Sequence, residues 1–306
     1  MTGVVTLSIE LELGWGMHDK PEYGHLSENR VKESDILNRL LDLGDSKELP
    51  ITFAIVGHLF HDSCQGHHPS PHPDSWWAED PGTDRSLNPY YYSPDLVEEI
   101  RERVVKHEIG THTYSHLLAE EASGEQLTYE LSKVENIYSD FGIPSPSSIV
   151  MPRHQVPDYS ILSDFGIDTI RCPMEVDSSS RSDPFSKFWS MITREHPVSN
   201  LQRSDGILET TVTPYPSLTS GMLPSGQSKP HPAFSLIPRR TRRNFHKQYL
   251  IDAIDRAADE GAHVHLWTHI FNMANEDQWS PIKAGLSHLA TQRDKGNVKV
   301  NRMKDL

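Results

Sequence analysis

Cysteine, long apolar runs and basic residues are all scarce in this chain. Only Cys64 and Cys172 carry thiols, and they lie far apart in the sequence. Two such cysteines do not form a disulfide framework, so a reducing compartment is expected. No apolar run approaches the ~20 residues that a membrane-spanning helix needs, and no basic segment followed by an apolar core opens the chain. We therefore expect a cytoplasmic protein that does not span a membrane.

The excess of acidic residues limits the classes of binding partner that are expected. Lys and Arg together number 29 against 43 Asp and Glu, which gives a formal net charge of −14 over 306 residues. This acidity argues against nucleic acid or an anionic membrane as the main partner. The length allows one large core and is ordinary for a single α/β barrel. The sequence leaves the oligomeric state open, and it contains no internal repeat.

Strand-like and helix-like segments alternate along the chain, which is typical of a parallel sheet flanked by helices. Residues 51–56 form a nearly continuous apolar run, as in a strand buried on both faces, and residues 31–43 carry an apolar stripe at helical spacing. We expect an α/β fold in a single domain, residues 1–306, with irregular inserts at 58–92 and 172–205. The remaining strands are expected at 4–12, just before 111, and at 148–151, 169–171, 207–212 and 264–268, and the remaining helices at 93–106, 119–141, 244–261 and 281–293, with one more ending near 166.

Two histidines follow the strand-like run that ends at Gly110. His112 and His116 are four positions apart, so in a helix their side chains would lie on one face. Two imidazoles so placed can bind one divalent metal ion. The alternative is a pair of capping or surface histidines at the start of a helix, and the spacing alone does not decide between the two.

The first strand presents two carboxylates on one face. Successive side chains of a strand point to opposite sides, so Glu10 and Glu12 share a side that the apolar residues leave free. Two buried carboxylates repel each other and persist only beside a positive charge. A metal held by Glu12, His112 and His116 would be that charge and would leave Glu10 free as a base. The alternative is a strand end that opens to water.

Four stretches, in this order, resemble the motifs of the polysaccharide deacetylase (NodB-like, carbohydrate esterase) family. Residues 8–16 are similar to its first motif, and residues 112–116 to its His-Ser/Thr-x-x-His metal motif. Residues 151–155 resemble its arginine motif, and residues 265–269 its terminal histidine motif. The resemblance spans residues 4 to 275. It implies a distorted (β/α) barrel and a metal-dependent hydrolase that removes an N-acyl group, N-acetyl first of all, from an amino sugar or a polysaccharide precursor.

The resemblance also implies a metal centre. A catalytic metal needs three protein ligands and an open position for water, and Glu12, His112 and His116 are the implied ligands. Zinc is the default ion, and cobalt, nickel or manganese could serve. The metal lowers the pKa of its water toward ~7 and polarises the substrate carbonyl.

Three further residues take catalytic roles by the same resemblance. Glu10 would accept the proton of the attacking water, and His269 would protonate the departing amine. Arg153 would hold Glu10 ionised and oriented. The family usually has Asp at the position of Glu10, and the longer side chain must fold back to reach the same water. The carboxyl ends of barrel strands share one face, so these residues are expected to converge there.

The insert 58–92 is rich in histidine and aromatic residues. A loop of this length in a compact domain is usually functional or disordered. Its aromatic rings could stack on sugars at the rim of the site, but we expect most of them to anchor the loop to the body. Its histidines could bind a second metal, although they lack regular ligand spacing. These residues are His58, His61, His67, His68 and His72, with Trp76, Trp77, Tyr90, Tyr91 and Tyr92.

Two other features stay open at this point. Glu209 could face a substrate or be structural. The cluster Arg239–Arg243 could bind a phosphate, as in a nucleotide sugar, but a solvated basic turn before a helix is favoured. The expected partner is thus an acylated amino sugar, and the sequence does not decide whether that sugar carries a phosphate.

Other functions fit the same residues. The metal site could instead open cyclic imides or ureides, or remove a formyl group. A protein disabled by the change at Glu10 could bind metal and carbohydrate without turnover. A purely structural barrel within a polysaccharide assembly complex is a further alternative.

Overall fold

The computed structural model describes residues 2–17, 24–174, 195–199, 201–230 and 232–306. Within this part, nine strands form one sheet in the order β6-β7-β5-β4-β3-β2-β1-β8, and β9 also pairs with β1. Every pairing is parallel except that of β6 with β7. The predicted α/β barrel with a parallel sheet is therefore confirmed. The strands are β1 (Gly3–Leu11), β2 (Thr52–Ile55), β3 (Glu108–Thr111), β4 (Ser148–Val150), β5 (Thr169–Pro173), β6 (Gln202–Ser204), β7 (Ile207–Val212), β8 (His263–His269) and β9 (Val298–Val300).

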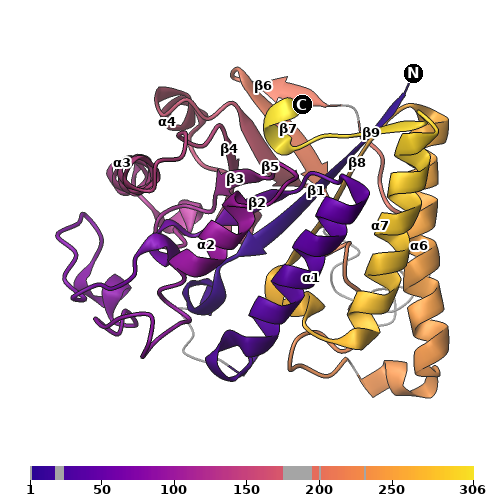
Figure 1. Cartoon of the computed structure of the whole chain (residues 1–306). Helices are drawn as coiled ribbons and strands as arrows, with labels where there is room; N and C mark the ends of the chain where they lie inside the picture. The colour runs from indigo at the N-terminus through magenta and orange to yellow at the C-terminus, as the bar shows by residue number, and fades with distance from the viewer. Residues whose placement is uncertain (1, 18–23, 175–194, 200, 231) are drawn as a thin grey trace.

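Helices alternate with these strands (Figure 1). The predicted apolar stripe of α1 is buried, and α3 begins with a capping box in which Ser123 and Gln126 satisfy each other's backbone amides. In Figure 1, α6 and α7 lie side by side on the far side of the sheet from α3 and α4. The helices are α1 (Val31–Lys47), α2 (Pro94–Arg101), α3 (Gly124–Asp140), α4 (Tyr159–Asp164), α6 (Arg239–Glu260) and α7 (Glu276–Asp294).

The central strand β1 separates an apolar from a polar face, as its alternation predicts. Leu7, Ile9 and Leu11 are buried in the main hydrophobic core together with residues of α1, α6 and α7. Ser8 and Glu10 are equally buried, on the polar face. Buried polar groups need partners, so this face determines where other polar side chains of the barrel must lie.

The barrel closes through side chains and loops between β7 and β8. The two strands lie side by side, and Thr210 Oγ1 is 2.7 Å from His265 Nδ1 across the gap. The free edge of β8 is covered by the segment after β7, because the amides of Ser217 and Leu218 both donate to the carbonyl of Trp267 at 3.0 Å. The distortion expected of this barrel is located at this seam.

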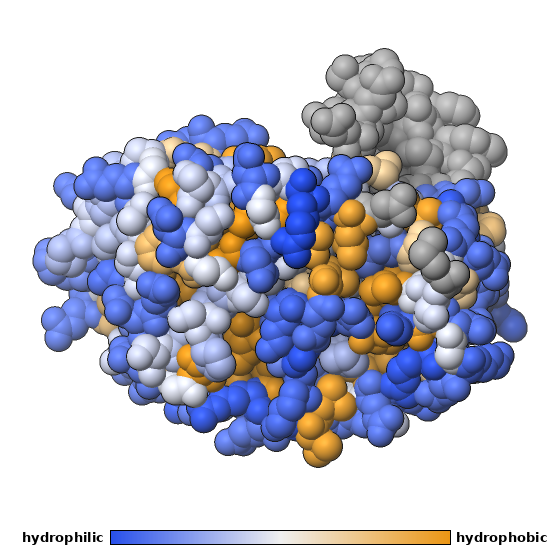
Figure 2. Space-filling view, turned by 90° about the horizontal axis from the view of Figure 1, so that it is seen from above, coloured by the Kyte–Doolittle hydropathy of each residue, from blue (hydrophilic) through white to orange (hydrophobic). Residues whose placement is uncertain are grey.

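The last described residues cover the amino ends of the central strands. β9 pairs with the start of β1, the amide of Met303 donates to Thr52 Oγ1 at 2.9 Å, and that of Lys304 donates to Glu108 Oε2 at 3.1 Å. The sequence patterns did not predict β6 or β9, both only three residues long. Seen from the top of Figure 1, the surface is largely hydrophilic with small hydrophobic areas between (Figure 2).

The two inserts differ in how much can be described. In the insert 58–92, Trp77, Tyr91 and Tyr92 are buried against the body, so the predicted anchoring role is confirmed for them. The insert 172–205 lies largely outside the described residues, which omit 175–194 and 200. No helix among the residues described is long and apolar enough to cross a membrane.

Candidate metal and catalytic centre

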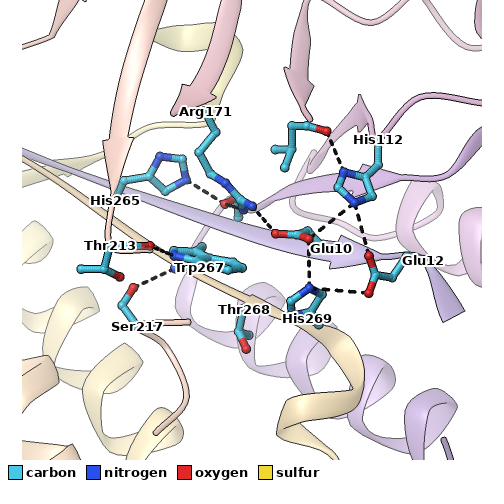
Figure 3. A network of polar contacts seen from close by, with 12 residues as sticks. Glu10, Glu12, His112, Arg171, Thr213, Ser217, His265, Trp267, Thr268 and His269 are labelled. Atoms are coloured by element: carbon cyan, nitrogen blue, oxygen red, sulfur yellow. Dashed lines mark hydrogen bonds and ion pairs between the residues drawn. The ribbon is translucent and has the colours of Figure 1, made fainter. Parts of the chain in front are cut away.

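Strand register brings Glu10 and His269 together. The two residues are partners in the parallel pairing of β1 with β8, so their side chains leave the sheet on the same side. His269 Nε2 lies 3.1 Å from Glu10 Oε2 (Figure 3). On the other side of β1 the partner of Glu10 is Ala54 of β2, whose small side chain leaves room for the carboxylate.

The arginine that contacts Glu10 is Arg171, in the middle of β5. Its guanidinium forms an ion pair with Glu10 Oε1, and its Nη1 donates to Ser8 Oγ at 3.1 Å (Figure 3). The guanidinium also lies over the ring of Trp267, 4.3 Å from the centroid. Arg171 is 1% exposed, so a fully buried cation holds the buried carboxylate.

The prediction that Arg153 orients Glu10 is therefore wrong. Arg153 lies in a short 3-10 turn after β4, has a positive φ of 53°, and its side chain is exposed. A signal for Arg171 was present in the sequence, because a charged residue at the end of a predicted buried strand needs a buried counter-charge. The same signal applies to Arg153, which follows the predicted strand 148–151, so by itself it does not distinguish the two arginines.

Glu12, His112 and His116 lie together as predicted. Glu12 Oε2 is 3.3 Å from His112 Nε2 and 3.1 Å from His116 Nε2, and all three side chains are buried. One ligand atom from each residue lies within 4.8 Å of the others. The other carboxylate oxygen, Oε1, is 3.5 Å from His269 Nε2, so the trio adjoins the Glu10–His269 pair.

The donor set fits a divalent metal. His112 Nδ1 donates to the carbonyl of Val150 at 2.6 Å, so Nε2 is the ring nitrogen that faces the Glu12 carboxylate, at 3.3 Å. A divalent cation between these two atoms would bind both. Burial lowers the pKa of His116 and so favours the neutral imidazole that binds metals.

The histidine pair does not lie on a helix. After β3 the chain makes turns, with positive φ at Thr113 (61°) and His116 (64°), and the amide of Leu117 donates to Thr113 Oγ1 at 2.8 Å. The helical arrangement under which the i, i+4 spacing would place both imidazoles on one face is not formed; a hydrogen-bonded loop turns them inward instead. The metal-binding prediction needed only convergence, which the loop provides.

Gly16 allows Glu12 its position. A Cβ atom at residue 16 would lie 2.3 Å from the carboxyl carbon of Glu12, a separation that no side chain can tolerate. Glycine at this point of the 3-10 turn Leu13–Met17 therefore lets the Glu12 carboxylate fold back over the backbone toward the histidines.

The charges in the centre fix the protonation of Glu10 and His269. Burial would raise the pKa of Glu10, but Arg171 and His269 outweigh it and hold this pKa well below the usual value. Burial would lower the pKa of His269, but the carboxylates of Glu10 and Glu12 raise it to about 9. A carboxylate and an imidazolium thus face each other, and the imidazolium side chain is 21% exposed.

A buried carboxylate from α3 supports the histidine loop. Glu130 accepts hydrogen bonds from the Ser115 amide at 2.7 Å and the Ser115 hydroxyl at 2.6 Å, and His72 Nε2 lies 3.0 Å from it. Trp76 donates to Ser115 Oγ at 2.8 Å. The insert 58–92 and α3 therefore hold the metal-binding loop together.

The two features that the sequence left open, Glu209 and the cluster Arg239–Arg243, make contacts within the described structure. Glu209 accepts from Tyr159 OH at 3.0 Å, a contact to the body of the barrel. In the cluster Arg239–Arg243, Arg242 is buried and donates to the carbonyl of Met222 at 2.6 Å. Arg239 and Arg243 each lie 3.6 Å from Asp277. Three of the four guanidiniums thus have structural partners at the start of α6.

Residues 26–170 match the model of the family described as polysaccharide deacetylase. This segment, just under half of the chain, is similar to that family. It contains the histidine loop, whereas Glu10, Glu12 and His269 lie outside it. No curated protein sequence matches the chain.

Solved structures share the fold. A candidate polysaccharide deacetylase from Mycobacterium smegmatis is 15% identical with a TM-score of 0.61, over 96% of this chain and 85% of that one. One from Pseudomonas aeruginosa PAO1 is 13% identical with a TM-score of 0.56, over 99% and 88%. Puue allantoinase is 12% identical, also with a TM-score of 0.56, over 99% and 88%. At such identities the likeness concerns the fold alone.

Proposed function

We propose that this protein is a metal-dependent amide hydrolase that removes an N-acyl group, N-acetyl first of all, from an amino sugar or polysaccharide precursor. The observation that carries the proposal is one buried centre in which Glu12, His112 and His116 adjoin a Glu10–His269 pair. The two cysteines are unpaired, in keeping with action in a reducing compartment such as the cytoplasm.

The metal would be held by Glu12, His112 and His116. A divalent cation, with zinc as the default and cobalt, nickel or manganese as substitutes, would polarise the acyl carbonyl and acidify a water. Glu10 holds Arg171 through Oε1, and its Oε2 lies 3.1 Å from His269 Nε2 and 3.5 Å from His112 Nε2, at the edge of the proposed metal site. With Glu12 as the carboxylate ligand, Glu10 remains free to accept the proton.

Proton transfer follows from the pairing of Glu10 with His269. As the water oxygen bonds to the acyl carbon, Glu10 accepts the proton that the water loses. When the carbon–nitrogen bond breaks, His269 Nε2 donates a proton to the nitrogen, because an amide nitrogen cannot leave as an anion. The products are a carboxylate, acetate for an N-acetyl group, and a free amine. The 3.1 Å contact between the two residues then lets the proton that Glu10 took from water pass to His269, which restores the carboxylate and the imidazolium.

Acetate release from N-acetylglucosamine oligomers by the zinc- or cobalt-loaded protein tests the proposal. Glu10→Gln should abolish release while the metal content stays unchanged, and His112→Ala should lose both metal and activity. Val156→Ala, a change at a side chain that is 60% exposed, serves as a folding control.

The alternatives give different results in the same assay. Hydrolysis of a cyclic ureide without release of acetate would move the protein to the imide- and ureide-opening reaction, and formate from an N-formyl sugar would make it a deformylase. Sugar binding without turnover under any of the four metals would overturn the enzyme proposal.

A further inference from the structure

The insert 58–92 contains a second group of metal-type ligands. His58, Cys64, His68 and Asp80 each offer one ligand atom, and these four atoms lie within 4.8 Å of one another. The insert lies beside α2, on the opposite side of the molecule from α6 and α7 (Figure 1). None of the four residues takes part in the proposed hydrolysis. We propose that this group, which we name the insert site, binds one zinc ion.

The atoms of the insert site converge on one point. Asp80 Oδ2 lies 2.5 Å from His68 Nε2 and 3.5 Å from His58 Nε2, and Cys64 Sγ is 3.5 Å from His68 Nε2. In a tetrahedral zinc site the ligand atoms are about 3.3–3.7 Å apart, given bonds of ~2.0–2.3 Å. Two of these three separations already have that value, and the His68–Asp80 pair would have to open by about 1 Å.

The buried histidine of the site faces it with a nitrogen that has no hydrogen bond. His58 is fully buried, and within the described part of the chain its Nε2 forms no hydrogen bond. Its Nδ1 lies 3.5 Å from the carbonyl of Tyr91, so Nε2 is the nitrogen directed at the site, 3.5 Å from Asp80 Oδ2. A buried polar atom without a partner is costly, and a metal ion at the convergence point would satisfy it.

The surrounding hydrogen bonds orient the other ligands. Asp80 Oδ1 accepts from Tyr92 OH at 2.5 Å and from the Gly82 amide at 3.1 Å, so only Oδ2 faces the histidines. The Gly66 amide donates to Cys64 Sγ at 3.4 Å. Outer partners of this kind fix ligand orientation in metal sites.

The same contacts exclude a Cys-His-Asp catalytic triad. In such a triad one ring nitrogen of the histidine meets the nucleophile and the other meets the carboxylate. Here the single atom Nε2 of His68 faces both Cys64 and Asp80. Two side chains that face one nitrogen of His68, joined by a second imidazole, that of His58, suit a central cation. Sulfur and nitrogen ligands together with one carboxylate suit zinc.

An ion at the insert site would fasten the insert to the metal-binding loop of the main centre. The amide of His58 donates to the carbonyl of Tyr114 at 2.8 Å, and His61 Nε2 is 2.9 Å from Tyr114 OH. Tyr114 lies between His112 and His116, so the two sites share a loop while their ligands remain separate.

Metal analysis of the full-length purified protein tests the proposal. Wild type should contain two equivalents of zinc, Cys64→Ala one, and His116→Ala one. His67→Ala is the matched control, because His67 is the exposed neighbour of His68, and it should retain two. A wild type that binds one equivalent, lost in His116→Ala and kept in Cys64→Ala, would overturn the proposal while leaving the proposed hydrolase intact.

Cobalt substitution gives a spectroscopic measurement that can be made on the wild-type protein. Cobalt in the insert site should produce a thiolate-to-cobalt charge-transfer band in the near ultraviolet, which Cys64→Ser should remove and Cys172→Ser should keep. The main centre has no sulfur ligand and contributes no such band. A wild-type protein loaded with two equivalents of cobalt that lacks the band overturns the assignment of Cys64 as a ligand.

Discussion

The family usually has Asp where this chain has Glu10, whose side chain is one methylene longer. The partners of Glu10 are placed for the longer side chain. Arg171 approaches from β5 and His269 from β8, one to each carboxylate oxygen. The extra methylene is therefore compensated by the position of Arg171, which lies on a different strand from the arginine motif that the sequence suggested.

Replacing Arg171 tests this compensation. In Arg171→Met the buried Glu10 loses its counter-charge, so its pKa should rise and the acidic limb of the kcat/KM profile should move to higher pH. We expect a loss of about 10²-fold in kcat/KM at pH 7, as for removal of a preorganised charge. The pH–rate profile and circular dichroism provide the measurement. Arg153→Met is the matched control and should behave like wild type; the reverse ranking of the two variants would restore the arginine motif to its predicted role.

Shortening Glu10 should lower activity, even though it restores the family's usual residue. In Glu10→Asp the carboxylate withdraws by one methylene from both Arg171 and His269, and a 1 Å misplacement can cost about 10²-fold. Steady-state acetate release with Glu10→Gln as the inactive reference measures the effect. An increase in rate would show instead that the longer side chain limits catalysis.

At the scale of elements, the sequence predicted those helices and strands whose apolar residues recur at regular spacing. The positions of β1, β2, β4, β7, β8 and of α1, α3, α6 and α7 were predicted, because their apolar patterns extend over several turns or residues. β6 and β9 are too short to carry a pattern. The loop after β3 does not form the helix in which the i, i+4 spacing would align its histidines; it is set by long-range bonds such as Ser115 to Glu130, which no local rule shows.

The same difference between local patterns and long-range contacts explains which site residues the sequence could predict. Glu10, Glu12, His112, His116 and His269 could be placed together, because strand alternation and the shared carboxyl edge of a barrel determine their positions. Arg171 could not be assigned, since which of the two arginines reaches Glu10 depends on the order of β4 and β5 in the sheet. The irregular spacing of the histidines in the insert 58–92 does not predict a metal site, and it does not point to Cys64 or Asp80. The side chains of the insert site come together through turns around Gly66 and Gly82, both with positive φ.

The support of the histidine loop by α3 can be tested through Glu130. In Glu130→Gln an amide group replaces an oxygen that accepts charge-assisted bonds from Ser115, so we expect a loss of about 2–3 kcal/mol in the free energy of unfolding. Metal affinity at the main centre should fall as well. Urea denaturation measures the first and metal titration the second. Glu125→Gln, exposed on the same helix, should change stability by less than about 0.5 kcal/mol; equal effects of the two changes would argue against the support.

At the scale of the whole molecule, buried neutral histidines link stability to pH. Burial lowers the pKa values of His107, His246 and His263 to about 4, from an ordinary 6.5. Between pH 6.5 and 4 the unfolded chain binds protons that the folded chain refuses, so each residue lowers the stability as the pH falls through this window, with its effect complete below about pH 4.

His246 isolates this effect, because its Nε2 donates to the carbonyl of Leu218 at 2.9 Å, far from either proposed metal site. His246→Gln keeps a donor but does not titrate, so its stability should fall less between pH 7 and 5, by up to about 2 kcal/mol relative to wild type. Urea midpoints at pH 7, 6 and 5 provide the measurement. Parallel pH curves for the two proteins would contradict the prediction.

The central strand also has a consequence for biosynthesis. β1 leaves the ribosome long before its neighbour β8; Thr6 and His263, for example, are in hydrogen-bond contact across 257 residues. At about 5–20 residues per second, β1 waits roughly 10 to 50 s for β8, with only α1 of the three helices that help to bury its apolar face already made. Translation that stalls before α6 should therefore leave apolar surface of β1 and its edge toward β8 exposed, and we expect such a fragment to aggregate.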